Sequence, residues 1–160
     1  MAVRIARDST ELPLSKRKEL LVDGLAVLNS TRNDSTYLDN LSKVSLISLR
    51  LKDSVLFRKT NTMVFNEALK EDNYKVLGES RWDLASYHRS RGTLDSAYFY
   101  FRKAYQSFNA LPTDSLSSSL KARMLYGMGQ MQEEFKDYLG AESNIVKAIR
   151  IYEELEDNRR

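Results

Sequence analysis

The sequence predicts an all-α fold of repeated helix pairs, and two observations support this prediction. Asp, followed in most cases by Ser or Asn, recurs every 19 to 23 residues, at Asp34, Asp53, Asp72, Asp95, Asp114, Asp137 and Asp157. Such side chains accept hydrogen bonds from the free N–H groups of a first helical turn, so they favour helix starts. Only 6 Gly and 2 Pro among 160 residues argue against a β-rich fold with many tight turns. A start signal about every 20 residues is typical of a helical repeat array.

We expect about seven helices, at residues 12–30, 36–52, 54–70, 74–91, 95–109, 115–135 and 138–156. The helix from Asp95 carries Ala97, Phe101, Ala104 and Phe108 on one face, spaced as a buried helix face requires. Short connections favour antiparallel neighbours, so we expect three helix pairs and one extra helix in a single domain over residues 1–160.

The composition predicts a folded chain and argues against membrane proteins and nucleic-acid binders. A hydrophobic fraction of 42% predicts a folded chain, and no apolar run reaches the roughly 20 residues that cross a bilayer, so we expect no membrane contact. The net charge is +3 with both signs interleaved, whereas a nucleic-acid binder usually has a basic stripe, so we expect no nucleic acid. Cysteine is absent, which excludes disulfides and thiolate metal sites.

The residues that could do chemistry are isolated from one another. His88 is the one histidine and falls at a packing position, where a structural role is favoured over a catalytic one. Gly127-Met128-Gly129 lacks the third glycine of a nucleotide-binding fingerprint, and Gly127 has no evident role. Acidic pairs such as Glu133-Glu134 point about 100° apart on a helix. We therefore expect a non-catalytic chain with no metal and no cofactor.

Two segments resemble tetratricopeptide repeats (TPR). They read Leu84-Ala85-x-x-His88-x-x-x-Gly92-x-Leu94-x-x-Ala97-x-x-x-Phe101-x-x-Ala104 and Met128-Gly129-x-x-Gln132-x-x-x-Lys136-x-Tyr138-x-x-Ala141-x-x-x-Ile145-x-x-Ala148. The small residues allow paired helices to approach closely. Clear repeats span about 74–109 and 115–156, and a degenerate repeat spans 36–70 with Phe65 and Ala68 as remnants. The resemblance implies a right-handed TPR-like α-solenoid.

A narrower resemblance concerns the phrase from Gly78 to Tyr87 together with the phrase from Leu94 to Tyr98. It is similar to long-period repeats in the sensory regions of bacterial sensor histidine kinases, and related repeats precede DNA-binding output domains in some regulators. The resemblance implies a sensory module of a two-component signal-transduction protein. It favours the extracytoplasmic, periplasmic side, with the cytoplasm as the alternative.

In the repeat family, ligands bind a concave groove lined by the first helix of each pair. Carried over by position, the groove residues are Glu79, Trp82, Ser86, Arg89, Arg123, Tyr126, Gln130 and Glu133. Trp82 and Tyr126 would offer rigid aromatic contacts, or pack between repeats. Arg89 and Arg123 would pair with a carboxylate, so an acidic protein or peptide is the expected partner.

Three functions remain open at this point. The first is a protein- or peptide-binding sensory module, the second is a structural or self-assembly spacer without a ligand of its own, and the third, least favoured, is RNA binding by helical repeats. Ile145, Ile149 and Tyr152 indicate a last helix that expects a neighbour. We therefore expect a piece of a longer protein, and a homodimer through this exposed terminal helix is a further candidate.

Overall fold

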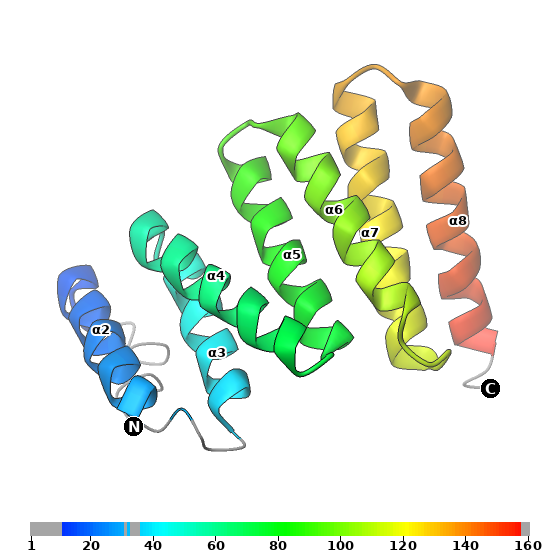
Figure 1. Cartoon of the computed structure of the whole chain (residues 1–160). Helices are drawn as coiled ribbons and strands as arrows, with labels where there is room; N and C mark the ends of the chain where they lie inside the picture. Colours follow the sequence, from blue (N-terminus) through cyan, green and yellow to red (C-terminus); the bar gives the residue numbers. More distant parts are fainter. Residues whose placement is uncertain (1–10, 31, 33–35, 158–160) are drawn as a thin grey trace. The chain divides into compact units, whose positions relative to one another are not determined.

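A computed structural model describes residues 11–30, 32 and 36–157, which form seven α-helices and no strand (Figure 1). The helices are α2 (Leu14–Ser30), α3 (Tyr37–Arg50), α4 (Ser54–Lys70), α5 (Tyr74–Ser90), α6 (Leu94–Asn109), α7 (Ser115–Glu134) and α8 (Tyr138–Asp157). The all-α prediction is confirmed, and the helix ends lie within two residues of those predicted. The right-handed course of the array stays a prediction.

Of the seven recurring Asp residues, Asp53, Asp114 and Asp137 cap a helix, and at Asp72 the cap is the following Asn73. Asp53 and Asn73 accept hydrogen bonds from the backbone N–H three residues later, at 3.0 and 3.1 Å. Asp137 does the same for Gly140 at 3.0 Å. Asp114 and Ser117 form a reciprocal capping box, with Asp114 Oδ1 accepting from the Ser117 N–H at 2.7 Å. The recurring Asp therefore marks helix starts for the physical reason expected.

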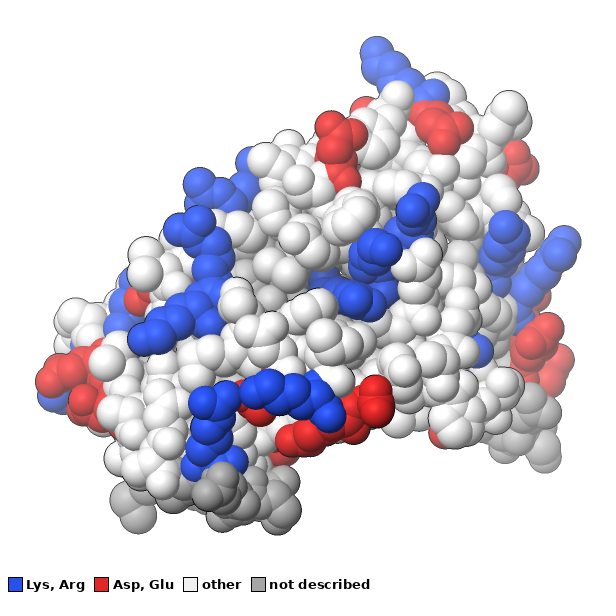
Figure 2. All heavy atoms as spheres, in the orientation of Figure 1, with Lys and Arg blue, Asp and Glu red and all other residues white. Residues whose placement is uncertain are grey.

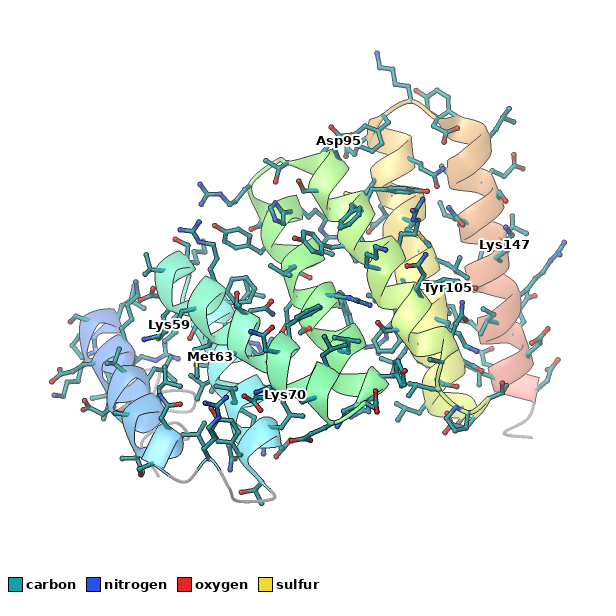
Figure 3. The ribbon with its side chains drawn as sticks, viewed as in Figure 1. Lys59, Met63, Lys70, Asp95, Tyr105 and Lys147 are labelled. Carbon is teal, nitrogen blue, oxygen red and sulfur yellow. The ribbon has the colours of Figure 1, made fainter. Side chains whose placement is uncertain are left out.

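The prediction that Asp95 begins a helix is wrong by one residue. Helix α6 starts at Leu94 with Thr93 at the N-cap, and Asp95 lies in the first turn, where Figure 3 shows it at the start of α6. An acid in the first turn still interacts favourably with the positive end of the helix dipole. Asp95 therefore does favour a helix start, but the start lies one residue earlier than predicted. Asp157 ends α8, and Asp34 lies outside the described residues.

The two helices of each pair are joined by a turn of the same geometry in all three pairs. Lys52, Gly92 and Lys136 have positive φ, at 55°, 72° and 63°. In each case the next residue donates its N–H to a carbonyl five residues earlier, at 2.9 to 3.1 Å. This is the pattern of a Schellman C-terminal cap. The turn aligns Gly92 with Lys136, in agreement with the register used for the resemblance.

The turn also fixes the register of the degenerate repeat. Counting from Lys52, Asn61 and Val64 occupy the places of Phe101 and Ala104. The register is thus four residues earlier than Phe65 and Ala68 indicated. A buried Asn at a core position explains why the sequence pattern was hard to recognise there.

The chain divides into two compact units, Met1–Asp72 and Asn73–Arg160. In the first, Leu21, Leu41 and Phe57 are fully buried between α2, α3 and α4. The side chain of Arg32 pairs with Glu67, and Lys18 Nζ lies 3.5 Å from Asp53 Oδ2. These ion pairs tie α4 and its preceding turn to residues at the two ends of α2.

The second unit contains α5 to α8, and its helices touch over very small residues. Ala97 and Ala104 are fully buried, as predicted for a helix–helix contact. A Cβ added at Gly127 would lie 2.7 Å from the Phe101 ring, and one at Gly129 would lie 2.6 Å from Ile145. Gly127 thus has a role that the sequence did not reveal: it lets α7 approach α6.

Candidate binding surface

The eight predicted groove residues all lie in the second unit, four on each of two helices. Helix α5 carries Glu79, Trp82, Ser86 and Arg89, and helix α7 carries Arg123, Tyr126, Gln130 and Glu133. On both helices the steps of three, four and three residues place the four side chains on one face. We refer to these eight residues as the α5–α7 surface.

Trp82 and Arg123 meet across the two helices. The guanidinium carbon of Arg123 lies 5.7 Å from the centre of the Trp82 ring, within the range of a cation–π contact. Trp82 is half-buried and packs against the core, whereas Arg123 is exposed. Trp82 therefore acts both as a packing residue and as the base on which Arg123 rests.

Arg89 and Gln130 form a second link between the helices. Arg89 Nη1 donates a hydrogen bond to Gln130 Oε1 at 3.0 Å. Both side chains reach solvent, Arg89 the more so. An exposed pair of this kind adds little stability, so its main effect is to hold the Arg89 side chain in one position.

The charge of the two arginines is not balanced locally. Among the described residues, no carboxylate lies within ion-pair distance of the Arg89 or Arg123 guanidinium, and their partners are a neutral amide and a ring. Glu79 pairs with Lys75 on its own helix at 3.3 Å. The surface therefore presents two positive charges held in place by neutral groups, together with the exposed carboxylate of Glu133, which forms no ion pair with a described residue.

The other predicted residues are not linked to this pair of contacts. Tyr126 is 47% exposed, and Ser86 and Glu133 lie on the same faces, with no side-chain hydrogen bond or ion pair to another described residue of the surface. Tyr126 is thus partly accessible to solvent on this face.

Arg81 is a half-buried cation that the sequence pattern did not single out. Its Nη1 donates to Ser107 Oγ at 2.6 Å and to the Lys103 carbonyl at 3.3 Å, which joins α5 to α6. Burial lowers the pKa of Arg81. Its position one residue before Trp82 turns it from the α5–α7 surface towards α6, so its role is structural.

His88 packs in an aromatic cluster at the turn from α5 to α6. Its ring stacks on Tyr100 at 5.3 Å between centroids, and Nδ1 lies 2.9 Å from Thr93 Oγ1. Burial, and secondarily the charge of Arg91, lower the pKa of His88. The neutral, stacked ring fits the packing role expected for this position.

Two other kinds of feature that bear on function are a metal-binding cluster and a membrane-spanning helix. No group of three or more His, Asp or Glu side chains could hold a metal ion within residues 11–30, 32 and 36–157. In the same residues, no helix has the length and apolar character needed to cross a bilayer. On the face shown in Figure 2, Lys and Arg form small separate groups among acidic and uncharged atoms.

Comparison with known proteins gives a likeness in fold. No protein-family model matches the chain, and no curated protein matches it. The chain is similar to the crystal structure of BtubC (BKLC) from P. vanneervenii, with a TM-score of 0.76 and 13% sequence identity over 89% of this chain. The chain spans 58% of the length of that protein. At this identity the likeness concerns the helical fold alone.

Proposed function

We propose that this chain is a non-catalytic, TPR-type module that binds an acidic protein or peptide segment through the α5–α7 surface. The observation that carries the proposal is the pair of exposed arginines, Arg89 and Arg123, whose only described partners are Gln130 and Trp82. Guanidinium groups recognise carboxylates through paired hydrogen bonds. Two such groups on adjacent helices suit a peptide with spaced acidic residues.

The neutral partners contribute to recognition. Gln130 and Trp82 restrict the arginine side chains before a ligand arrives, so less conformational freedom is lost on binding. Neither contact neutralises the positive charge of the arginine, because the amide and the ring are uncharged. Tyr126, 47% exposed on the same face of α7, supplies an aromatic contact for an apolar residue of the ligand.

The biological setting that we propose is the sensory region of a bacterial signal-transduction protein, such as a sensor histidine kinase. The support is the sequence phrase from Gly78 to Tyr87 together with that from Leu94 to Tyr98, which resembles sensory repeats. A repeated turn in all three helix pairs supports the repeat assignment.

The test is a selection of random peptides on the immobilised chain, followed by affinity measurement on the enriched peptides. The wild-type chain should enrich peptides of net negative charge, with binding that weakens as salt rises. The double variant Arg89→Glu with Arg123→Glu reverses the local charge and should lose this preference. Its melting temperature should fall by a few degrees at most, because each exposed contact contributes only about 0.5 kcal/mol.

The matched control reverses the same number of charges elsewhere in the second unit. Arg102 on α6 and Lys147 on α8 lie on second helices of their pairs and are exposed. Arg102→Glu with Lys147→Glu should keep the acidic preference. If both double variants lose binding equally, the effect is one of net charge and the α5–α7 surface is not the site.

The alternative function is a structural or self-assembly spacer. The observation that favours it is the exposed apolar face of α8, where Ile149 is 48% and Leu139 is 82% exposed. A spacer would enrich no peptide in the selection above.

A further inference from the structure

The two arginines of the α5–α7 surface lie at two separate levels along the helices. Arg123 lies over the Trp82 ring, and Arg89 donates a hydrogen bond to Gln130. Arg89 follows Trp82 by seven residues on α5, and Gln130 follows Arg123 by seven residues on α7. The helices therefore run in the same direction with a constant offset. Seven residues of α-helix rise about 10 Å, which is the separation of the two arginine contacts along the surface.

The surface between the two arginine levels offers an apolar contact and no charge. On α7, Tyr126 lies midway between the levels and is 47% exposed. On α5, the uncharged Ser86 lies midway between them. A carboxylate placed here would meet no cation of the surface, whereas an apolar side chain would meet the Tyr126 ring. The two favourable positions for a carboxylate are thus separate from each other.

The two ends of the surface differ in charge. Before the level of Arg123, Glu79 pairs with Lys75 at 3.3 Å, so this end is nearly neutral. After the level of Arg89, Glu133 is exposed and forms no ion pair with another described residue. Glu133 follows Gln130 by three residues, which is about 4.5 Å along α7. The region that attracts a carboxylate therefore ends at Arg89.

We infer that the α5–α7 surface takes an extended peptide segment with acidic residues at positions i and i+3, an inference that rests on the proposed function. A polyproline II segment has three residues per turn and rises about 3.1 Å per residue, so residues i and i+3 lie on one side about 9 Å apart. On a β-strand, side chains of one side lie about 7 or 13 Å apart. The polyproline II spacing is the one that matches the two arginine contacts.

An α-helical ligand would match the same separation with acidic residues at positions i and i+7. A helix of only two or three turns is unstable in water by itself, so ordering it on the surface costs free energy. Polyproline II is already a major conformation of unfolded chains. The extended segment is therefore favoured, and one of its two intervening residues contacts Tyr126.

The test uses labelled proline-rich peptides that each carry two glutamates, at positions i and i+2, i and i+3, or i and i+4. The prolines hold the polyproline II conformation, and all three peptides have the same net charge. Fluorescence anisotropy measures each dissociation constant on the wild-type chain. The i, i+3 peptide should bind about tenfold more tightly than the other two, because only its two carboxylates reach both arginines together.

The outcomes separate this inference from the proposed function. Equal dissociation constants for the three peptides would mean that net charge alone decides, and would overturn the i, i+3 spacing. Tighter binding of the i, i+2 or i, i+4 peptide, or of a helical peptide with glutamates at i and i+7, would also overturn it. The proposed function itself fails if none of these peptides binds, or if Arg89→Glu with Arg123→Glu binds them as the wild-type chain does, and the inference then fails with it.

Replacing Glu133 tests whether the second carboxylate lies at Arg89. Glu133→Gln should lower the dissociation constant of the i, i+3 peptide about two- to fivefold, because it removes an exposed repulsion beside that arginine. Glu134→Gln is the matched control: it makes the same change of charge at an exposed position about 100° around α7 and should have a smaller effect. An equal effect of both substitutions would overturn the placement of a carboxylate at Arg89.

Discussion

Replacing Gly127 with alanine tests the close approach of α6 and α7. An added Cβ would lie 2.7 Å from the Phe101 ring, several tenths of an ångström inside ordinary contact. The ring is 3% exposed and has little room to move. Overpacking of this kind costs about 1–3 kcal/mol, whereas Gly to Ala in a helix gains about 1 kcal/mol. We expect a net loss of about 1 kcal/mol in the free energy of unfolding.

Urea unfolding followed by the fluorescence of Trp82, the single tryptophan, measures this loss within the second unit. The control is the same substitution in a Phe101→Leu background, where the ring is gone. There Gly127→Ala should become neutral or stabilising by up to about 1 kcal/mol, which gives a coupling energy of about 1–2 kcal/mol between the two positions. If Gly127→Ala stabilises the wild-type chain, the contact does not restrict α7 and the reasoning fails.

Four further substitutions test three separate features by urea titration. Ala97→Leu and Ala104→Leu should each cost about 1–3 kcal/mol, because both sites are fully buried, and changes under about 0.3 kcal/mol at both would contradict this packing. Asp114→Ala removes a capping box and should cost about 1 kcal/mol. Because burial lowers the pKa of His88 below its ordinary 6.5, stability should be complete above that pH and decline as pH falls through it; His88→Tyr should weaken this dependence.

The helices were predictable because their signals are local. A cap such as Asp53 or Asp114 acts within three residues of its own position, so sequence alone carries the information. The start at Asp95 was misplaced because the left-handed turn at Gly92 fixes where α6 begins, through the Thr93 N–H bond to the His88 carbonyl. The geometry of the turn at Gly92, and not the side chain of Asp95, thus determines the first residue of α6.

The contacts made by the predicted surface residues could not be predicted from the sequence. Periodicity places Trp82 and Arg123 on the outward faces of their helices, yet their encounter depends on the spacing between α5 and α7. That spacing follows from contacts of both helices with α6, which no single-helix pattern records. The same limit applies to Gly127, whose role exists only because Phe101 of another helix lies against it.

The spacing explains why long side chains bridge the α5–α7 surface. Helix α7 approaches α6 closely at Gly127, and α5 approaches α6 closely at Gly78, where a Cβ would lie 2.4 Å from Phe108. Each first helix is thus held by the second helix between them. Two long side chains make the described links between α5 and α7. Arg123 lies over the Trp82 ring, and Arg89 donates a hydrogen bond to Gln130. The positions of the two arginines therefore depend on the close packing of α5 and α7 against α6 at Gly78 and Gly127.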